Sequence, residues 1–319
     1  MKKLCLESNE NGSSLIITGD IDSIFSNRRA ARYLKDTVKF AKTDGSIIVE
    51  ADDDINKSID RIKKLCDYIG AELVYSGRVS EAVTNYALEE EKFGEFAEKA
   101  RLIRDNHCDK DDFERFVDSV SKNLSNRSLY KLQLLSAYHL AFSQNACNFS
   151  VPGAGKTSVV YGAFAYLSNL PQEDKKYVDR LLIVSPLSAF GPWEFEYEEC
   201  FGEKPSTRRL NGKVPIEEKK QYLYSFNPAR ITLLSYASVS ALKDELIYFL
   251  KNNKVMVVLD EAHKIKNTNG GVTAAGVLEI ASYCSSRVVL TGTPAPNGYE
   301  DLYNLYKFIW PTKKIIPFE

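Results

Sequence analysis

The chain has 319 residues, of which 44% are hydrophobic and 27% are charged, values typical of a globular protein. The 42 Lys and Arg residues balance 43 Asp and Glu residues, which leaves a formal net charge of −1. This balance excludes a histone-like protein that binds by bulk positive charge, although it allows nucleic-acid binding through a local groove. A chain of this length favours two domains over one.

Six cysteines are scattered along the chain and form no C-x-x-C pair. Such a pattern favours reduced thiols in the cytosol over a disulfide framework or a metal site. The N-terminal MKKLCLESNENG turns polar too soon for a signal peptide, and no apolar run approaches the ~18 residues of a membrane span. We therefore expect a cytoplasmic protein that has no membrane partner.

Residues 1–124 are expected to form a small α/β accessory domain with a helical C-terminal part. The runs LCLES and SLIITGD flank an Asn-Gly turn signal and predict a hairpin, while SIIVEAD and AELVYSG predict further strands. One helix is expected between them, with Ile24, Ala31, Leu34 and Val38 on its apolar face. Between 79 and 124 the pattern is helical, and its expected buried stripe is Phe93, Phe96, Phe113, Phe116 and Val120. No recognisable chemistry lies in this part.

Residues 125–319 alternate short apolar runs with helical patterns. The expected strands are CNFSV, LLIVSP, the segment near TRRLNG, ITLLSY, VMVVLD and RVVLTGTP. Apolar strands separated by helices are typical of a parallel sheet that is covered on both faces. The fold class predicted for the chain is therefore α/β, with a central parallel sheet in the second domain.

The segment FSVPGAGKTSVV, residues 149–160, resembles a phosphate-binding loop. It matches G-x-x-x-x-G-K-[ST] except that Ser150 stands at the first glycine position. Glycines let backbone N–H groups turn toward phosphate oxygens, and the following helix adds its positive N-terminus. The alternative is a glycine turn before a helix with a chance Lys-Thr pair. The residues expected to bind the nucleotide are Pro152, Gly153, Ala154, Gly155, Lys156, Thr157 and Ser158.

Two carboxylates, Asp260 and Glu261, follow the apolar run Val255–Leu259. In open α/β sheets, ligands bind beyond the carboxyl ends of the strands. We expect Asp260 and Thr157 to hold Mg²⁺, Lys156 to reach the β- and γ-phosphates, and Glu261 to orient and deprotonate the attacking water. The alternative, a solvated strand end, is disfavoured because a phosphate-binding loop precedes it in the same alternating pattern.

Six segments in order, SLYKLQ, PGAGKT, LIVSPLSAFGPWEFEY, ITLLSYASV, DEAHKIKN and RVVLTGTPAPNGYEDLYNLYKFI, carry a family resemblance. They resemble the first RecA-like motor lobe of helicase superfamily two, and within it the Swi/Snf-like ATPases. The resemblance covers residues 125–319 and implies an ATP- and Mg²⁺-dependent ATPase that translocates on duplex DNA. It also implies a second RecA-like lobe with arginine fingers, which we expect outside this chain, in a longer protein or a partner chain.

The resemblance implies further residue roles. Gln133 would read the adenine edge, although without the family context it reads as a surface glutamine. His263 would link the acidic motif to the coupling motif. Trp193 is interpreted as core packing. The segments expected to touch the nucleic-acid backbone are Pro186, Leu187 and Ser188, and then Ser235 and Tyr236; the coupling motif is Thr291, Gly292 and Thr293.

Two alternatives remain open at the level of the sequence. One is a nucleotide-sensing module that binds DNA or protein without efficient turnover, which the expected absence of a second lobe favours and the Asp260-Glu261 pair disfavours. The other is an RNA helicase lobe. The contexts DEAHKIKN and TGTPAPN favour the duplex-DNA family over it.

Overall fold

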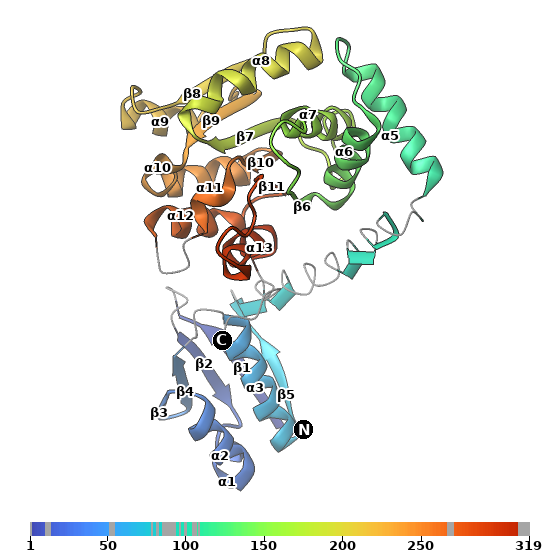
Figure 1. The fold of residues 1–319 in the computed structure, drawn as a ribbon. Coiled ribbons are helices and arrows are strands. Elements are labelled where there is room, and N and C mark those ends of the chain that lie inside the picture. The colour runs from blue at the N-terminus through green and yellow to red at the C-terminus, as the bar shows by residue number, and fades with distance from the viewer. Residues whose placement is uncertain are drawn as a thin grey trace. The chain divides into compact units, whose positions relative to one another are not determined.

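The computed structural model describes residues 2–9, 14–50, 55–77, 109–266 and 271–311. It also describes residues 79–80, 83–84, 94–95, 97–98, 101–103 and 107. The chain divides into two compact units, Met1–Gly94 and Glu95–Glu319, which are taken separately below (Figure 1). Two members of the expected buried stripe, Phe93 and Phe96, lie outside the described residues.

The first unit contains a five-stranded sheet in the order β3-β4-β2-β1-β5. Strands β1 and β2 are antiparallel, as the predicted hairpin requires, and the turn residues 10–13 lie outside the described part. Strand β5 pairs with β1 in parallel. The strands are β1 (Lys2–Ser8), β2 (Ser14–Gly19), β3 (Phe40–Thr43), β4 (Ser46–Glu50) and β5 (Ala71–Tyr75).

Three helices pack on this sheet: α1 (Asp22–Ser26), α2 (Arg28–Thr37) and α3 (Ile55–Ile69). The prediction of one continuous helix after β2 was wrong, because the Asn27 side chain accepts from the backbone N–H groups of Arg29 and Ala30 and starts a new helix. The break changes the phase of the buried face, which contains Ile24, Ala30 and Leu34, while Ala31 is only partly buried.

The second unit is built on six strands in the order β6-β11-β10-β7-β9-β8, and every neighbouring pair is parallel. The predicted parallel sheet is therefore confirmed. Because all strands run in one direction, their carboxyl ends meet at one edge of the sheet. The strands are β6 (Asn145–Asn148), β7 (Arg180–Ser185), β8 (Thr207–Leu210), β9 (Ile231–Ser235), β10 (Val255–Leu259) and β11 (Ser286–Leu290).

Helices cover both faces of this sheet, with α6 and α7 on one side and α11 and α12 on the other (Figure 1). None of the described helices combines the length and the apolar character needed to cross a bilayer. The helices are α5 (Lys110–Asn123), α6 (Lys131–Ser143), α7 (Lys156–Leu167), α8 (Phe190–Phe201), α9 (Ile216–Leu223), α10 (Tyr236–Val239), α11 (Lys243–Asn252), α12 (Val272–Ala281) and α13 (Tyr303–Ile309).

Helix α5 packs with the second unit. Phe116, Val120 and Leu124 belong to the same buried cluster as residues of α6 and α7, and Phe113 packs against its border. The compact unit therefore begins at Glu95, ahead of residue 125, where the recognisable motifs begin. The assignment of residues 1–124 to a functionally separate accessory domain stays a prediction.

Arg287 ties two helices to the central sheet. Its Nε donates to Ala281 O at 2.7 Å, at the end of α12, and its Nη1 donates to Ile309 O at 3.0 Å, at the end of α13. The residue is only 4% exposed, although it belongs to strand β11. Its guanidinium therefore satisfies helix-terminal carbonyls that have no partner within their own helices.

We predict that Arg287→Met lowers the free energy of unfolding by about 3 kcal/mol, because it leaves buried carbonyls without a charged donor. Urea denaturation measures the change. The matched control is Arg209→Met, which removes an exposed pair with Glu194 and should cost under about 1 kcal/mol. Equal stability of the two variants would contradict the anchoring role of Arg287.

Candidate functional site

The loop between β6 and α7 has the conformation that the sequence predicts for a phosphate cradle. Gly153 and Gly155 have φ values of +83° and +77°, in the left-handed region that glycine favours. A Cβ at Gly155 would also lie 2.3 Å from Gln133 Nε2, so a side chain there would displace the Gln133 amide. Lys156 folds back over the loop and donates to Ser150 O at 3.0 Å and Val151 O at 3.3 Å.

Gln133 braces the loop from α6. Its Nε2 donates to Ala154 O at 3.1 Å, and its Oε1 accepts from the backbone N–H of Tyr130 at 3.1 Å. An amide nitrogen has a second hydrogen and an amide oxygen a second lone pair, so further contacts remain chemically available. The structure brings Gln133 to the nucleotide loop, and its reading of adenine stays a prediction.

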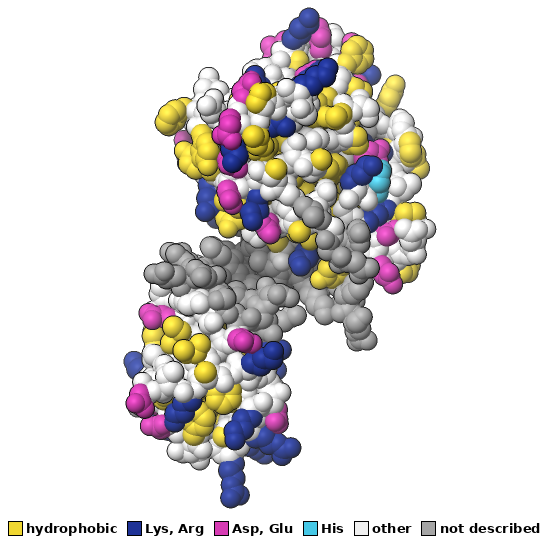
Figure 2. All heavy atoms as spheres, turned by 90° about the vertical axis from the view of Figure 1, so that its left-hand side faces the viewer, with side chains coloured by type: hydrophobic (Ala, Val, Ile, Leu, Met, Phe, Trp, Pro, Cys, Tyr) yellow, Lys and Arg dark blue, Asp and Glu magenta, His cyan; other side chains and the backbone are white. Residues whose placement is uncertain are grey.

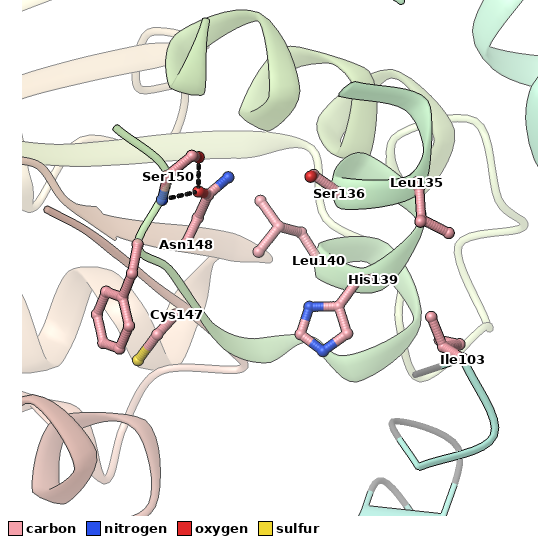
Figure 3. A pocket seen from close by; sticks show the side chains of 9 residues that line it. Ile103, Leu135, Ser136, His139, Leu140, Cys147, Asn148 and Ser150 are labelled. Atoms are coloured by element: carbon pink, nitrogen blue, oxygen red, sulfur yellow. Dashed lines mark hydrogen bonds between the residues drawn. The ribbon is translucent and has the colours of Figure 1, made fainter. Parts of the chain in front are cut away.

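Ser150, which stands at the first glycine position of the motif, is held by hydrogen bonds to Asn148. Asn148 Oδ1 accepts from the Ser150 N–H at 3.0 Å and from the Ser150 hydroxyl (Figure 3). Asn148 O also accepts from Thr291 N at 3.3 Å, which joins the loop to β11. Asn148 was missed at the level of the sequence. It lies at the end of β6, beside a pocket of about 380 Å³ that α6 lines with Ser136 and His139.

Ser158 faces α8. Its hydroxyl donates to the carboxylate of Glu196, which also pairs with Arg127. Ser158 is buried, whereas the preceding Thr157 is partly exposed at the N-terminus of α7. A pocket of about 400 Å³ lies between the first turn of α7 and α8, and Phe195 contributes to its wall. Arg127, Glu196 and Phe195 were not among the expected site residues.

Asp260 receives three hydrogen bonds at the end of β10. Its Oδ2 accepts from Trp193 Nε1 at 2.9 Å, its Oδ1 accepts from Glu261 N at 3.0 Å, and its backbone O accepts from the Tyr236 hydroxyl at 2.9 Å. Burial raises the pKa of the Asp260 carboxyl, and the Trp193 bond and the positive charge of Lys156 lower it in part. A desolvated carboxylate near Lys156 suits a site that gains a cation when it is loaded.

Glu261 adopts a left-handed backbone with φ +51° and ψ 48°. For a residue with a Cβ this conformation costs on the order of 1–2 kcal/mol and is found mainly where the surroundings impose it. Its side chain is about half exposed, at 48%, and its Oε2 lies 3.1 Å from His263 Nδ1. The strained turn therefore presents the Glu261 carboxylate to solvent beside the more deeply buried Asp260.

The expected coupling motif touches the phosphate cradle. Thr291 is buried, and its Oγ1 accepts from Thr293 N at 3.2 Å. A Cβ on Gly292 would lie 2.9 Å from Pro152 Cδ, so the two loops are in close contact. This contact between the two motifs was not predictable from their spacing in the sequence.

Lys266 joins the acidic segment to the coupling motif. Its Nζ donates to Thr293 O and lies 3.7 Å from Asp301 Oδ2, with both side chains about nine-tenths buried (9% and 11% exposed). Among the described residues, the hydrogen bond from Lys266 Nζ to Thr293 O connects the acidic segment to the coupling motif. The structure places His263 beside Glu261, so its expected link to the threonines stays a prediction. Lys266 is the second of the two lysines in DEAHKIKN, and the sequence alone did not indicate which of them makes this contact.

The segments expected to contact nucleic acid follow β7 and β9, which are neighbours in the sheet. Leu187 and Ser188 are exposed, Pro186 is partly buried, and the Ser235 hydroxyl lies 3.0 Å from that of Ser238. Tyr236 is different, because it is 7% exposed and its hydroxyl points inward to Asp260. Four of the five residues thus lie at or near the surface, and Tyr236 does not.

Thr157 and Asp260 suit Mg²⁺ that arrives with a nucleotide. Among the described residues, no group of three or more His, Cys, Asp and Glu side chains could hold a metal ion. Mg²⁺ commonly takes only one or two protein ligands and completes its shell with phosphates and water. The donor set therefore fits a nucleotide-bound ion better than an independent metal site.

Comparison with protein-family models identifies a family for this chain. Residues 147–314 match the SNF2-related domain family. The chain belongs to this family. The resemblance to the motor region of Swi/Snf-like ATPases of helicase superfamily two is thereby confirmed, and the relatives of the chain include proteins named as ATP-dependent helicases.

Individual relatives align with the same region. The DNA repair protein RAD5 of Candida albicans is 33% identical over 182 residues, covering 47% of this chain and 16% of the relative. The SWI/SNF chromatin-remodeling complex subunit snf22 of Schizosaccharomyces pombe is 28% identical over 159 residues, covering 50% and 9%. An uncharacterized ATP-dependent helicase of Mycoplasma genitalium is 30% identical over 159 residues, covering 50% and 14%. The chain thus spans a small part of these relatives.

We predict that Asp260→Asn raises the thermal midpoint of unfolding at neutral pH in the absence of Mg²⁺. A carboxyl whose pKa is raised by folding destabilises the fold where it is ionised. An amide removes that charge, and its single oxygen keeps the bond from Trp193 Nε1 while the local bond from Glu261 N is given up. The gain should shrink as the pH falls toward the unfolded pKa of about 3.9. Thermal denaturation across this pH range measures it.

The matched control is Asp301→Asn, which changes another buried aspartate. Asp301 pairs with Lys266 and accepts from Asn297 N at 3.0 Å, so its neutralisation should lower the thermal midpoint. A lower midpoint for Asp260→Asn as well would show that Asp260 serves the fold rather than a ligand.

We also predict that Gly292→Ala weakens nucleotide binding by about tenfold or more. The new Cβ would displace Pro152, whose ring is tied to the backbone of the phosphate cradle, and such overpacking typically costs about 1–3 kcal/mol. Titration with a fluorescent ATP analogue measures the affinity. Gly191→Ala is the control, because a Cβ there meets nothing within 4 Å. Unchanged nucleotide affinity in Gly292→Ala would show that the coupling motif does not influence the cradle.

Proposed function

We propose that the second unit is the ATP-binding first motor lobe of a DNA-stimulated ATPase that translocates on duplex DNA. The observation that carries this proposal is the convergence at one edge of the parallel sheet. The phosphate cradle follows β6, the coupling motif follows β11, the acidic pair follows β10, and the two expected nucleic-acid segments follow β7 and β9. In this proposal, adjacent strand ends would bring the ATP chemistry next to the DNA contacts.

Each residue near the cradle has a role in this proposal. Lys156 exchanges its loop carbonyl partners for the β- and γ-phosphates, which neutralises charge during phosphoryl transfer. Thr157 and Asp260 hold Mg²⁺, which supplies charge neutralisation at the phosphates. Glu261, presented at the surface by its left-handed backbone, orients and deprotonates the attacking water. Pro152 to Ser158 form the wall and floor of the cradle, and Gln133 reads the adenine.

DNA is the proposed partner because of the relatives' names and the chemistry of the exposed turns. RAD5 and human RAD54B are DNA repair proteins by name, and snf22 is a subunit of a chromatin-remodeling complex. Small polar residues such as Ser188 and Ser235 suit phosphate contacts. On the side of the second unit seen in Figure 2, basic and acidic side chains are interspersed. Binding there would depend on local groups instead of a broad basic surface.

Efficient turnover in this proposal needs a second RecA-like lobe. Such a lobe closes over the nucleotide and supplies an arginine finger, which is worth ~10³–10⁵ in rate in phosphoryl transfer. It would come from a longer protein or from a partner chain. His263, Thr291, Gly292 and Thr293 would couple the nucleotide to the DNA contacts, with Lys266 tying the acidic and coupling segments together.

We predict that Mg²⁺-dependent ATP turnover by the chain, with any second lobe supplied, rises with duplex DNA and falls at least about 10²-fold in Lys156→Ala. Steady-state phosphate release measures it, with single-stranded DNA and RNA as comparison substrates. Lys213→Ala, an exposed lysine in a loop away from the cradle, is the matched control. Stimulation by RNA alone would favour an RNA helicase. Turnover that survives Lys156→Ala would refute the assigned cradle.

A further inference from the structure

Two buried aromatic side chains, Trp193 and Tyr236, converge on Asp260. Trp193 Nε1 donates to Asp260 Oδ2 at 2.9 Å, and the Tyr236 hydroxyl donates to Asp260 O at 2.9 Å. Trp193 comes from the segment after β7 and Tyr236 from the segment after β9. Because β10, β7 and β9 are consecutive in the sheet, the three residues meet at neighbouring strand ends.

The two bonds act on different parts of Asp260. The indole N–H holds one carboxylate oxygen and so restricts the rotation of the carboxylate. The Tyr236 hydroxyl holds the backbone carbonyl at the peptide that leads into Glu261, the residue with φ +51°. Together the bonds define the direction of the Asp260 carboxylate and the turn that presents Glu261.

Each aromatic residue is joined by a short, packed path to an exposed turn. The turn Leu187–Ala189 leads directly into α8, and Trp193 lies in the first turn of that helix. Tyr236 follows Ser235 directly and begins α10. Leu187 is 55% exposed, whereas Trp193 is 1% exposed. A ligand that shifts either exposed turn would therefore shift a hydrogen-bond donor of Asp260.

Trp193 has a second connection, to the helix of the phosphate cradle. The hydroxyl of the buried Tyr161, in α7, donates to Trp193 O at 2.6 Å, and the two rings pack edge to face with centroids 5.5 Å apart. Trp193 is thus held between the cradle helix and the acidic motif. Trp193 also belongs to the buried core cluster, as expected from the sequence, so one side chain both packs the core and joins these two elements.

We propose that Trp193 and Tyr236 are positioning residues that transmit nucleic-acid contact at the turns after β7 and β9 to Asp260 and Glu261. This inference rests on the proposed function, because it requires that the same unit binds both nucleotide and DNA. In this scheme Tyr236 acts from inside the protein, as an internal hydrogen-bond donor and not as a DNA contact. The nucleotide site would then be sensitive to DNA through two hydrogen bonds.

The test is the thermodynamic coupling between DNA and nucleotide in the full chain. The probe is a fluorescent, non-hydrolysable ATP analogue with Mg²⁺, titrated with and without saturating duplex DNA. We expect DNA to change the Kd of the analogue by about fivefold or more, and by linkage the analogue changes the Kd of DNA by the same factor. In Tyr236→Phe, which removes only the hydroxyl, this factor should fall to about one.

Two further variants refine the test. Tyr222→Phe removes another part-buried tyrosine hydroxyl, one that is bonded to Thr232 and Ala229, and should keep the coupling factor. The chain has two tryptophans, so Trp310→Phe leaves Trp193 as the single tryptophan, whose emission can be excited selectively over that of tyrosine. Its emission should then respond to the Mg²⁺-bound analogue. Trp193→Phe should lose the coupling too, although its smaller ring leaves a cavity in the core.

The outcomes separate this inference from the function on which it rests. A chain that binds both ligands and loses their coupling in Tyr236→Phe but keeps it in Tyr222→Phe supports the inference. Full coupling in Tyr236→Phe overturns it and leaves the proposed function intact. Loss of DNA binding in Tyr236→Phe would make Tyr236 a direct contact and also overturns it. If the unaltered chain binds neither ligand, the proposed function fails and the inference falls with it.

Discussion

Parallel pairing of the six strands in the second unit is the constraint on which the other features depend. Antiparallel pairing would send alternate strand ends to opposite edges of the sheet. Parallel pairing instead gathers the ends of β6, β11, β10, β7 and β9 at a single edge. Asn148, at the end of β6, and Thr291, directly after β11, become neighbours because their strands run in the same direction.

Two glycines allow the loops at this edge of the sheet to lie in close contact. Gly155 leaves room for the amide of Gln133, and Gly292 leaves room for the ring of Pro152. Each glycine permits a close approach between segments that come from different elements. The shape of the cradle therefore depends on the α6 and β11 segments as well as on its own backbone. The loop sequence alone does not specify these contacts.

Buried polar groups then divide into two kinds. Arg287 and the pair of Lys266 with Asp301 satisfy specific partners and stabilise the packing of helices and loops on the sheet. Asp260 is different, because its carboxylate accepts from two neutral N–H groups, whereas Asp301 pairs with the charged Lys266. A protein keeps such a group where a ligand completes its surroundings. Asp260 is therefore the candidate for ligand binding, and Asp301 stabilises the packing of the loops.

The amino-acid sequence by itself determined the α/β class, the strand order along the chain and the family, because apolar periodicity and short motifs are local properties. Only the tertiary structure decided how those motifs touch. It turned Tyr236 inward, gave Trp193 a carboxylate partner, let Lys266 reach the coupling motif and started a new helix at Asn27. These are contacts between side chains and backbone atoms, and most join residues far apart in the chain. Their partners depend on packing distances of a few ångströms that residue spacing does not specify.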